Sequence, residues 1–526
     1  MNDERRMKSE SLSDSLTYWT LDTDKTMELI HIIFGMKLRQ ARLEAGLTLT
    51  DLARQAEMSP SYLTEIEKGR KYPRADKIVK MAEALGKPYD DLVSIRLAPS
   101  LRYLESTLSS TTMQRFPFEE FGLEPADALG LLTREPERAG ALLHAVIEIA
   151  RRYDLREEEF LRAALRAYLE MHENYFPDLE EAALAFTAGY GPRYGFGEDT
   201  LPSLATLESI LRDEYGYTID DRALAATEEL RAYRSLLLPG RRPQLFINNR
   251  LYARQVRFIL AREIGYCVLG IKDRSLLSTP DRVDSFQQLL NDARAAYFGG
   301  ALLMPRGRVL ADLQAFFALP TWEPERFSAL LTTYDVTPEM LLYRFSELIP
   351  EFFGIKLHFL RFHHATGTDD YHLVRHLNMN QLLVPSGVGL FEHHCRRWLS
   401  IRLLPDAPGA AADPLPVGIQ LSEFLSTQER FLCLGFGRRM VLAPGMASSV
   451  IIGFRVDAEL RHAIRFLDDP TIPHDIINET CQRCPLTPEQ CAVRAAPPAI
   501  LEARREQTAR KLALSQLQAR HAVDDR

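Results

Sequence analysis

The sequence predicts a multidomain protein that is mainly α-helical and has an α+β C-terminal half. With 526 residues, 46% of them hydrophobic, the chain is long enough for several packed cores. Apolar residues recur at helical spacing through "LLHAVIEIARRYDLREEEFLRAALRAYLEMHENYF", whereas "LHFLRFHH" at 357–364 alternates as a strand does. A run of about 18 apolar residues and a signal sequence are both absent, so we expect a cytoplasmic protein without a membrane partner.

The segment from Met36 to Arg96 differs in charge from the rest of the chain. It holds twelve Lys or Arg against nine Asp or Glu, whereas the whole chain has a net charge of −8. Its apolar residues predict several short helices. Thr48 is suited to cap one of them, and Ser59 followed by Pro60 to start the next, after a tight turn around Glu57. Two short helices joined in this way have the geometry of a DNA-binding helix-turn-helix.

Three blocks of this segment, "GLTLTDLA", "MSPSYLTEIEKGRKYP" and "ADKIVKMAEALG", closely resemble the XRE/Cro-type repressor family. The resemblance implies a structural ion pair between Arg42 and Glu67, and a homodimer bound to paired half-sites of a double-stranded DNA operator. It also implies that the second helix faces base edges and that the cations after it contact phosphates, the alternative being a merely solvated charged loop. The implied DNA-binding residues are Thr48, Ser59, Pro60, Ser61, Thr64, Glu65, Lys68, Arg70, Lys71 and Arg74.

The middle of the chain reads as a strand, "RRPQLFINN", followed by two helices. The phrases "FILAREIGY" and "AAYFGGALLMP" in those helices resemble the ImmA/IrrE-type metallopeptidase-like domain. Active members carry H-E-x-x-H, in which two histidines bind zinc beside a glutamate base. Here Arg262 and Tyr266 replace the histidines, and arginine cannot ligate a metal. We therefore expect no enzymatic activity, an ion pair between Arg262 and Glu263, and a surface carboxylate at Asp292.

Three cysteines near the C-terminus have the spacing of metal ligands. Cys481 and Cys484 can hold one metal centre, and Cys491 can return to it on a turn. Four ligands are normally needed, so a fourth must come from elsewhere. Cys395 is favoured over His474 because an all-thiolate shell suits iron–sulfur chemistry. Spacing alone leaves open a zinc site, an iron–sulfur cluster and unliganded buried thiols.

The other cysteines and the histidines carry weaker signals. Cys267 and Cys433 lie in apolar strings, which is typical of small core residues. Seven histidines fall between His358 and His394, but their spacings fit no single metal site. Arginines and aromatic residues in the same part of the chain could bind the phosphates and the acyl chain of a ligand, but no motif singles any of them out.

Four blocks of the second half resemble one family. They are "HENYFPDLEEAA", "DVTPEMLLYRFSELIPEFFGIKLHFLRFHH", "FEHHCRRW" and "CQRCPLTPEQCAVRAAPP", and they resemble the short-chain fatty acyl transcriptional regulators. The resemblance extends over nearly all of 36–498. It implies a regulator of propionate, acetate or related acyl metabolism that senses a short-chain acyl-CoA. It also implies a [4Fe–4S] cluster on Cys395, Cys481, Cys484 and Cys491, with Zn²⁺ as the alternative.

The expected domains follow from these patterns. They are a flexible N-terminal extension (1–34), an XRE-type helix-turn-helix domain of five helices (35–98), a helical connector or dimerisation region (99–200), a degenerate metallopeptidase-like domain (201–350), an α+β ligand-sensing domain with the cysteine cluster (351–498) and a charged C-terminal helix or tail (499–526). Two other functions stay open: a zinc-containing DNA-binding regulator without metabolite sensing, and a repressor-cleaving metallopeptidase.

Overall fold

The protein divides into two compact units, Met1–Leu161 and Arg162–Arg526. The computed structural model describes residues 23–94, 157–278, 283, 285–380, 382, 392–404 and 416–524. The first part of the predicted connector, up to residue 156, therefore lies outside the described residues.

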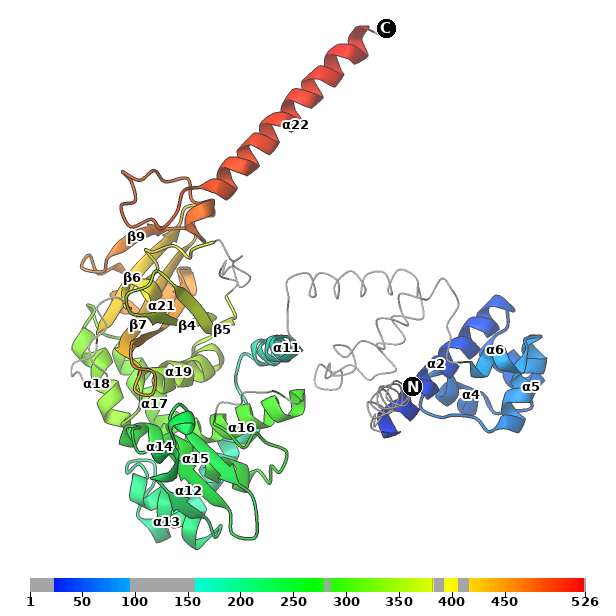
Figure 1. The fold of residues 1–526 in the computed structure, drawn as a ribbon, viewed down its shortest axis with the longest axis horizontal. Coiled ribbons are helices and arrows are strands. Elements are labelled where there is room, and N and C mark those ends of the chain that lie inside the picture. The colour runs from blue at the N-terminus through cyan, green and yellow to red at the C-terminus, as the bar shows by residue number, and fades with distance from the viewer. Residues whose placement is uncertain are drawn as a thin grey trace, which may run out of the picture. The chain divides into compact units, whose positions relative to one another are not determined.

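The described part of the first unit contains five helices, as the sequence predicts (Figure 1). They are α2 (Thr23–Glu44), α3 (Leu49–Gln55), α4 (Pro60–Glu67), α5 (Ala75–Leu85) and α6 (Tyr89–Val93). Their apolar faces form one core, which includes Leu38, Leu52, Leu63, Ile66 and Met81, all of them fully buried. The core is small because each helix contributes only one or two turns of apolar residues.

Helix α2 begins earlier than the predicted domain boundary. Residues 1–34 were expected to form a flexible extension, but the chain is helical from Thr23 onward. The physical reason is burial: Phe34 belongs to the core, and its ring lies 5.1 Å from that of Tyr72. Gly35 follows, and a Cβ at that position would lie 2.3 Å from the carbonyl oxygen of Ile66. Residues on both sides of position 35 are therefore packed against the rest of the domain.

A run of helices and a three-stranded sheet make up the first part of the second unit, and the first of these helices starts at the end of the first unit. The helices are α11 (Glu157–Met171), α12 (Pro177–Tyr194), α13 (Leu204–Asp213), α14 (Ala223–Ala226), α15 (Ala253–Val268), α16 (Phe286–Leu303), α17 (Arg306–Phe317), α18 (Pro324–Tyr334) and α19 (Pro338–Phe353). The sheet has the order β1 (Thr218–Asp220), β3 (Gln244–Ile247), β2 (Ser235–Leu238). The predicted strand and the two helices after it are β3, α15 and α16, and α12, α13, α15 and α16 share one buried core.

A six-stranded sheet forms the other half of this unit. Its order is β5 (Tyr371–Asn378), β4 (Leu357–Ala365), β8 (Met446–Arg455), β7 (Arg430–Arg439), β6 (Val417–Phe424), β9 (His474–Ile477). All neighbours are antiparallel except β6 and β9, which are parallel. The predicted strand "LHFLRFHH" is β4, but neither of its faces is fully solvated, because His358 is buried on one face and Phe359 on the other.

The two faces of this sheet carry different chemistry, because successive side chains of a strand point to opposite faces. On one face, the ring of Phe359 meets Tyr343 of α19. On the other, Leu360 and Phe362 belong to a core that includes residues of α20 (Leu399–Arg402). The faces are called the α19 face and the α20 face below.

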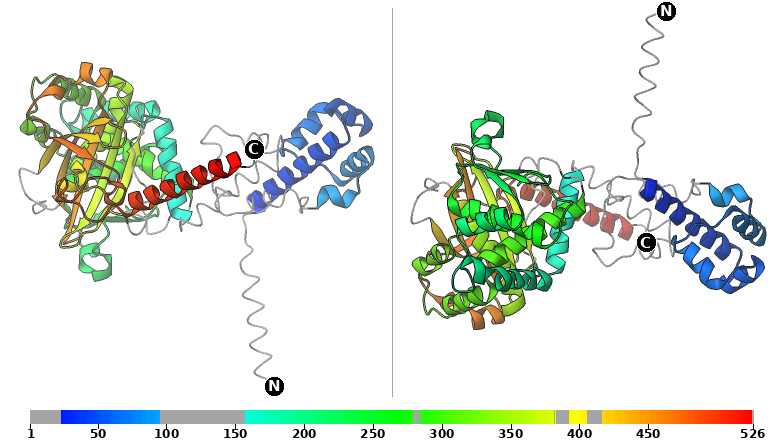
Figure 2. Two further views of the ribbon diagram at one scale, coloured as in Figure 1. Left: turned by 90° about the horizontal axis from the view of Figure 1, so that it is seen from above. Right: turned by 90° about the horizontal axis from the view of Figure 1, so that it is seen from below.

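The chain ends in α22 (Ala499–Asp524), which confirms the predicted C-terminal helix. Figures 1 and 2 show it projecting as a single helix from its unit. None of the helices in the described ranges is long and apolar enough to cross a membrane.

Candidate nucleic-acid interface and cysteine site

Local hydrogen bonds fix the start of α4 and the turn before it. The side chain of Ser59 accepts a hydrogen bond from the backbone N–H of Tyr62 at 3.2 Å, so it caps the helix as predicted. Thr48 and Asp51 cap α3 reciprocally. Between the two helices Glu57 has φ +55°, a left-handed conformation that reverses the chain. The first turn of α4 is therefore held by its own side chains and presented at the surface.

A buried ion pair anchors the other end of α4. Arg42 of α2 donates from Nε to Glu67 at 2.6 Å and from Nη2 at 2.9 Å, and both residues are buried. Arg42 also donates to the carbonyl of Leu47 at 3.0 Å. The hydrogen bond to Glu67 raises the pKa of Arg42. The predicted structural ion pair is confirmed, and it ties α2, α4 and the loop before α3 together.

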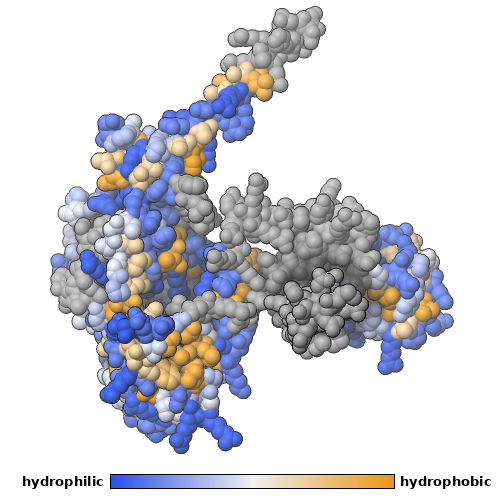
Figure 3. Space-filling model, in the orientation of Figure 1, coloured by the Kyte–Doolittle hydropathy of each residue, from blue (hydrophilic) through white to orange (hydrophobic). Residues whose placement is uncertain are grey.

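The predicted DNA-contacting residues lie at the surface of this domain, which Figure 3 shows as mostly hydrophilic with smaller hydrophobic areas. All are exposed except Thr64 and Glu65, which are half-buried. The hydroxyl of Thr64 donates to the carbonyl of Pro60 at 2.9 Å, and Glu65 lies 3.5 Å from Nη1 of Arg70. These two side chains therefore have internal partners. Their role in DNA binding stays a prediction, as does that of the other eight residues.

Helix α15 contains the segment that resembles the zinc-binding helix of peptidases, and its Glu263 forms an ion pair. Glu263 accepts two hydrogen bonds from Arg274, at 2.6 and 2.7 Å, and the side chain of Glu263 is 1% exposed. The predicted pair between Arg262 and Glu263 is therefore wrong. Adjacent residues of a helix point in different directions, and Arg262 donates instead to the carbonyl of Ser278 at 3.3 Å.

Tyr266, at the position of the second zinc histidine in the peptidase motif, also has partners inside the protein. Its hydroxyl donates to Asp292 at 2.6 Å, and its ring lies 3.4 Å from the guanidinium carbon of Arg274. Asp292 accepts a second bond, from the backbone N–H of Ser275 at 3.1 Å. The expectation of a surface carboxylate at Asp292 is wrong, because Asp292 is half-buried and bonded to both of these groups.

The C-terminal cysteine segment pairs with the segment that contains Cys395. His394 and Thr480 form an antiparallel bridge, which places the cysteine that follows each of them in the same part of the molecule. The backbone N–H of Cys395 donates to the carbonyl of Glu479, and that of Cys481 to the carbonyl of His393. Residues almost ninety positions apart in the sequence are thus brought together.

The four thiols share one buried environment. Cys395, Cys481, Cys484 and Cys491 are all between 4% and 7% exposed. The pKa of Cys395 is raised to about 11, chiefly by burial, and negative charge on Cys481 or Cys484 acts in the same direction. Burial also raises the pKa of Cys484, with Cys491 and Cys481 acting in the same direction. The thiols are therefore close enough to influence one another's ionisation.

Backbone N–H groups surround these sulfurs. Ala495 donates to the sulfur of Cys481 at 3.4 Å. The N–H groups of Asn478 and Arg397 lower the pKa of Cys395 by hydrogen bonding, and that of Leu486 lowers the pKa of Cys484. Such donors stabilise thiolates and are one way in which proteins tune iron–sulfur clusters. In the described ranges, no three His, Cys, Asp or Glu side chains are placed closely enough to hold a metal ion as they stand.

Other residues that were considered as metal or ligand contacts have different partners. His474, the alternative fourth ligand, lies 3.0 Å from Glu423 and is exposed. Arg397 donates to the carbonyls of Ile476 and Gln490 and so fastens the cysteine segment. Cys267 lies 3.6 Å from the hydroxyl of Tyr217.

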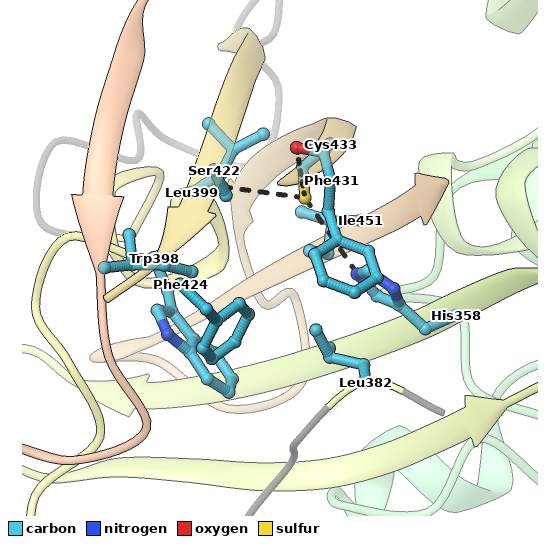
Figure 4. Close-up of a pocket in the computed structure, with 10 residues that line it drawn as sticks. His358, Leu382, Trp398, Leu399, Ser422, Phe424, Phe431, Cys433 and Ile451 are labelled. Atoms are coloured by element: carbon cyan, nitrogen blue, oxygen red, sulfur yellow. Dashed lines mark hydrogen bonds between the residues drawn. The ribbon is translucent and has the colours of Figure 1, made fainter. Parts of the chain in front are cut away.

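A small cavity lies on the α20 face of the sheet, next to the segment that follows Cys395 (Figure 4). It has about 20 Å³ of free space, enough for roughly one water molecule. It is lined by His358, Leu382, Trp398, Leu399, Ser422, Phe424, Phe431, Cys433, Ile451 and Ile477. At its polar end, the sulfur of Cys433 lies 3.8 Å from the hydroxyl of Ser422 and 3.9 Å from Nε2 of His358. Burial lowers the pKa of His358 to about 4 and raises that of Cys433 to about 12. Both are neutral at pH 7, so the cavity suits a small uncharged group.

Two domain families match the chain. Residues 38–92 match a helix-turn-helix family, and residues 218–346 match the IrrE N-terminal-like domain of the M78 peptidase family. The second match starts at β1 and ends within α19, so it includes the ion pair of Glu263 and Arg274.

Similar proteins include regulators from Mycobacterium tuberculosis. The HTH-type transcriptional regulator RamB of strain H37Rv is 26% identical over 357 residues, which covers 62% of this chain and 68% of RamB. The transcriptional regulator ClgR of the same strain is 38% identical over 60 residues, 11% of this chain and 54% of ClgR. A solved Mycobacterium tuberculosis transcriptional regulator has 20% identity and a TM-score of 0.43, covering 63% of this chain and 92% of its own.

Proposed function

We propose that the protein is a cytoplasmic, DNA-binding transcriptional regulator of short-chain acyl metabolism. In this proposal a homodimer binds an operator through α4, and the second unit binds a short-chain acyl-CoA and holds a [4Fe–4S] cluster. The DNA-binding part is supported by the first unit, where two capped helices and the ion pair between Arg42 and Glu67 hold α4 with its N-terminal end exposed. Helix-turn-helix proteins bind DNA with such a helix in the major groove.

The cluster proposal is supported by the donor set. Four buried thiols, from two segments joined by the bridge of His394 and Thr480, would hold the cluster through Cys395, Cys481, Cys484 and Cys491. Neutral buried thiols have raised pKa values, which a bound cluster would lower because it is ligated by thiolates. A cluster in this place would supply redox or iron-dependent chemistry. The backbone N–H groups of Asn478, Arg397 and Ala495 would stabilise the thiolates.

The acyl-CoA proposal is supported by the apolar cavity on the α20 face. Its free space of about 20 Å³ would have to widen to admit an acyl group, because small-molecule sites measure roughly 300 Å³ or more. A modest rearrangement of the lining side chains would admit an acyl chain of a few carbons more readily than a long one. Trp398 lines the cavity and donates from its indole nitrogen to the carbonyl of Asn478, whose N–H reaches Cys395. A ligand that contacts Trp398 would thus be linked to Cys395 through one residue, Asn478.

We also propose that the IrrE-like domain has no peptidase activity. Glu263 cannot act as a general base while it neutralises Arg274. Arg262 has no lone pair for a metal, and the hydroxyl of Tyr266 is bonded to Asp292, so neither replaces a zinc histidine. The rival function, cleavage of a partner repressor, predicts bound zinc in this domain and proteolysis that is lost in Glu263→Gln.

Anaerobic purification tests the cluster. We expect a brown protein with broad visible absorbance, stoichiometric iron and sulfide, and loss of the colour in Cys484→Ser but not in Cys267→Ser. Colourless protein that contains one zinc per chain, again dependent on Cys484, would instead support the zinc-containing regulator.

A further inference from the structure

Two arginines contact one glutamate on the α19 face of the large sheet, and two further arginines lie near enough to add their charge. Arg438 of β7 donates from Nε to Glu339 at 3.0 Å, and its Nη2 lies 2.7 Å from the same carboxylate. Arg361 of β4 lies 3.8 Å from Glu339. Arg234, which precedes β2, belongs to the same group, because the positive charges of Arg361, Arg438 and Arg262 lower its pKa. The negative charge of Glu339 raises that pKa and so opposes them. The cluster therefore has three more positive than negative charges.

Such an arrangement is unfavourable without an anion. Like charges held together repel, and burial removes the water that would screen them. Burial and the three neighbouring cations lower the pKa of Arg234 to about 10, and burial also lowers that of Arg361. Arg438 is buried and the other three arginines are half-buried, so water screens this repulsion only in part. Guanidinium groups are, however, the preferred partners of phosphates.

Arg262 gives the cluster a second feature. It stands at the position where a zinc histidine would be, and its Nε is buried without a hydrogen-bond partner in the described part of the chain. A neutral histidine can bind a metal cation, whereas the permanently charged Arg262 repels cations and attracts anions. A region that would accept a metal cation in a peptidase is thus suited to an anion here.

We propose that Arg234, Arg262, Arg361 and Arg438 form a binding site for a diphosphate-bearing ligand. The site lies on the face of the sheet opposite to the apolar cavity, because Arg361 alternates with Leu360 and Phe362 of the α20 face. Two sources share this chemistry: the diphosphate of a CoA molecule, and a free nucleotide or pyrophosphate. The inference does not depend on which of these regulates the protein.

Calorimetric titration of the full-length protein with inorganic pyrophosphate, ADP and CoA tests the site. We expect pyrophosphate to bind, and Arg234→Gln and Arg361→Gln each to weaken binding roughly tenfold or more, as expected for lost hydrogen bonds to a charged group. The matched control is Arg461→Gln, because Arg461 is an exposed arginine of the same unit that pairs with Asp468. CoA that binds more tightly than pyrophosphate and ADP identifies CoA as the source, and equal binding of all three identifies a free phosphate compound.

Thermal unfolding without ligand separates a binding site from a structural cluster. If the arginines serve a ligand, Arg234→Gln relieves repulsion and raises the unfolding temperature of the ligand-free protein, while it reduces the stabilisation by pyrophosphate. The inference is overturned if none of the three compounds binds, or if both variants bind them as the wild type does. Pyrophosphate binding with no effect of acyl-CoA on DNA affinity would refute the proposed effector and leave this site intact.

Discussion

Helix α4 corresponds to the DNA-contacting helix of helix-turn-helix domains, and α15 to the zinc-binding helix of M78-type peptidases. The side chains of the two helices have different kinds of partner. In α4, the residues at the N-terminal end are exposed, and the buried ion pair at Glu67 lies at the other end. In α15, Glu263 and Tyr266 are bonded to Arg274 and Asp292 inside the protein. Helix α4 is held in place with its N-terminal surface exposed. In α15, by contrast, the residues at the positions of the zinc-binding motif are bonded to other parts of the protein. Similarity of fold therefore says less about function than the partners of a few side chains do.

The largest expected effect concerns Glu263. In Glu263→Ala a buried Arg274 loses its partner, which typically costs about 3–5 kcal/mol. We expect the IrrE-like domain to unfold at a markedly lower denaturant concentration, as followed by hydrogen exchange of α15 amides in the full chain. Glu263→Gln, which keeps the volume and one acceptor, should lose less. Unchanged stability in Glu263→Ala would mean that the carboxylate is not structural and would revive its role as a base.

A smaller loss is expected at the other ion pair. Arg42→Ala removes charge-assisted hydrogen bonds to Glu67 and Leu47, for a cost of about 2–3 kcal/mol. Hydrogen exchange should accelerate in α4 and α2, and DNA affinity should fall because α4 is no longer held. Arg54→Ala is the control, since Arg54 is exposed and pairs only within α3. Equal effects of the two variants would contradict the anchoring role.

Acid should destabilise the second unit through buried histidines. Burial lowers the pKa values of His358, His363 and His376 to about 4. The unfolded chain binds more protons than the folded one between pH 6.5 and 4, so stability is lost as pH falls through this window. For His358 the slope is about 1.4 kcal/mol per pH unit. Denaturant titrations of wild type and His358→Gln should show a shallower pH dependence in the variant, and identical slopes would refute the assignment.

The smallest expected change is at the DNA surface. Lys71→Ala should remove one phosphate contact, which reduces the slope of log affinity against log salt by about 0.9. Lys87→Ala is the control, because Lys87 pairs with Glu44 away from α4. Anisotropy titrations at several salt concentrations measure both slopes. An unchanged slope in Lys71→Ala would place Lys71 in a solvated loop.

The sequence was most informative where function depends on neighbours along the chain. Thr48, Ser59 and Glu57 were predicted correctly as caps and turn, because capping involves residues three positions apart. The strand β3 and helices α15 and α16 were also predicted from periodicity alone. The early start of α2 was missed, because the burial of Phe34 depends on the ring of Tyr72 from a distant loop.

Partners from distant segments could not be predicted. Nothing in the spacing of "REIGY" indicates that Arg274, beyond the end of α15, takes Glu263 as its partner. Arg234, Arg361 and Arg438 come from three strands or their ends, so no local motif could connect them. The approach of Cys395 to the C-terminal cysteines was expected, but not from spacing: a fourth ligand was needed from elsewhere, and "FEHHCRRW" resembles a family block that supplies a thiolate.

The most direct test of the proposed regulator is linkage between its two units. Full-length, anaerobically purified protein would be titrated with the DNA upstream of its own coding sequence, with and without acetyl-CoA and propionyl-CoA. We predict specific binding whose affinity one of these compounds changes, and an equal reciprocal change in acyl-CoA affinity when DNA is bound, because such coupling is symmetric. DNA affinity that no acyl-CoA alters, or binding no tighter than to unrelated DNA, would contradict the account.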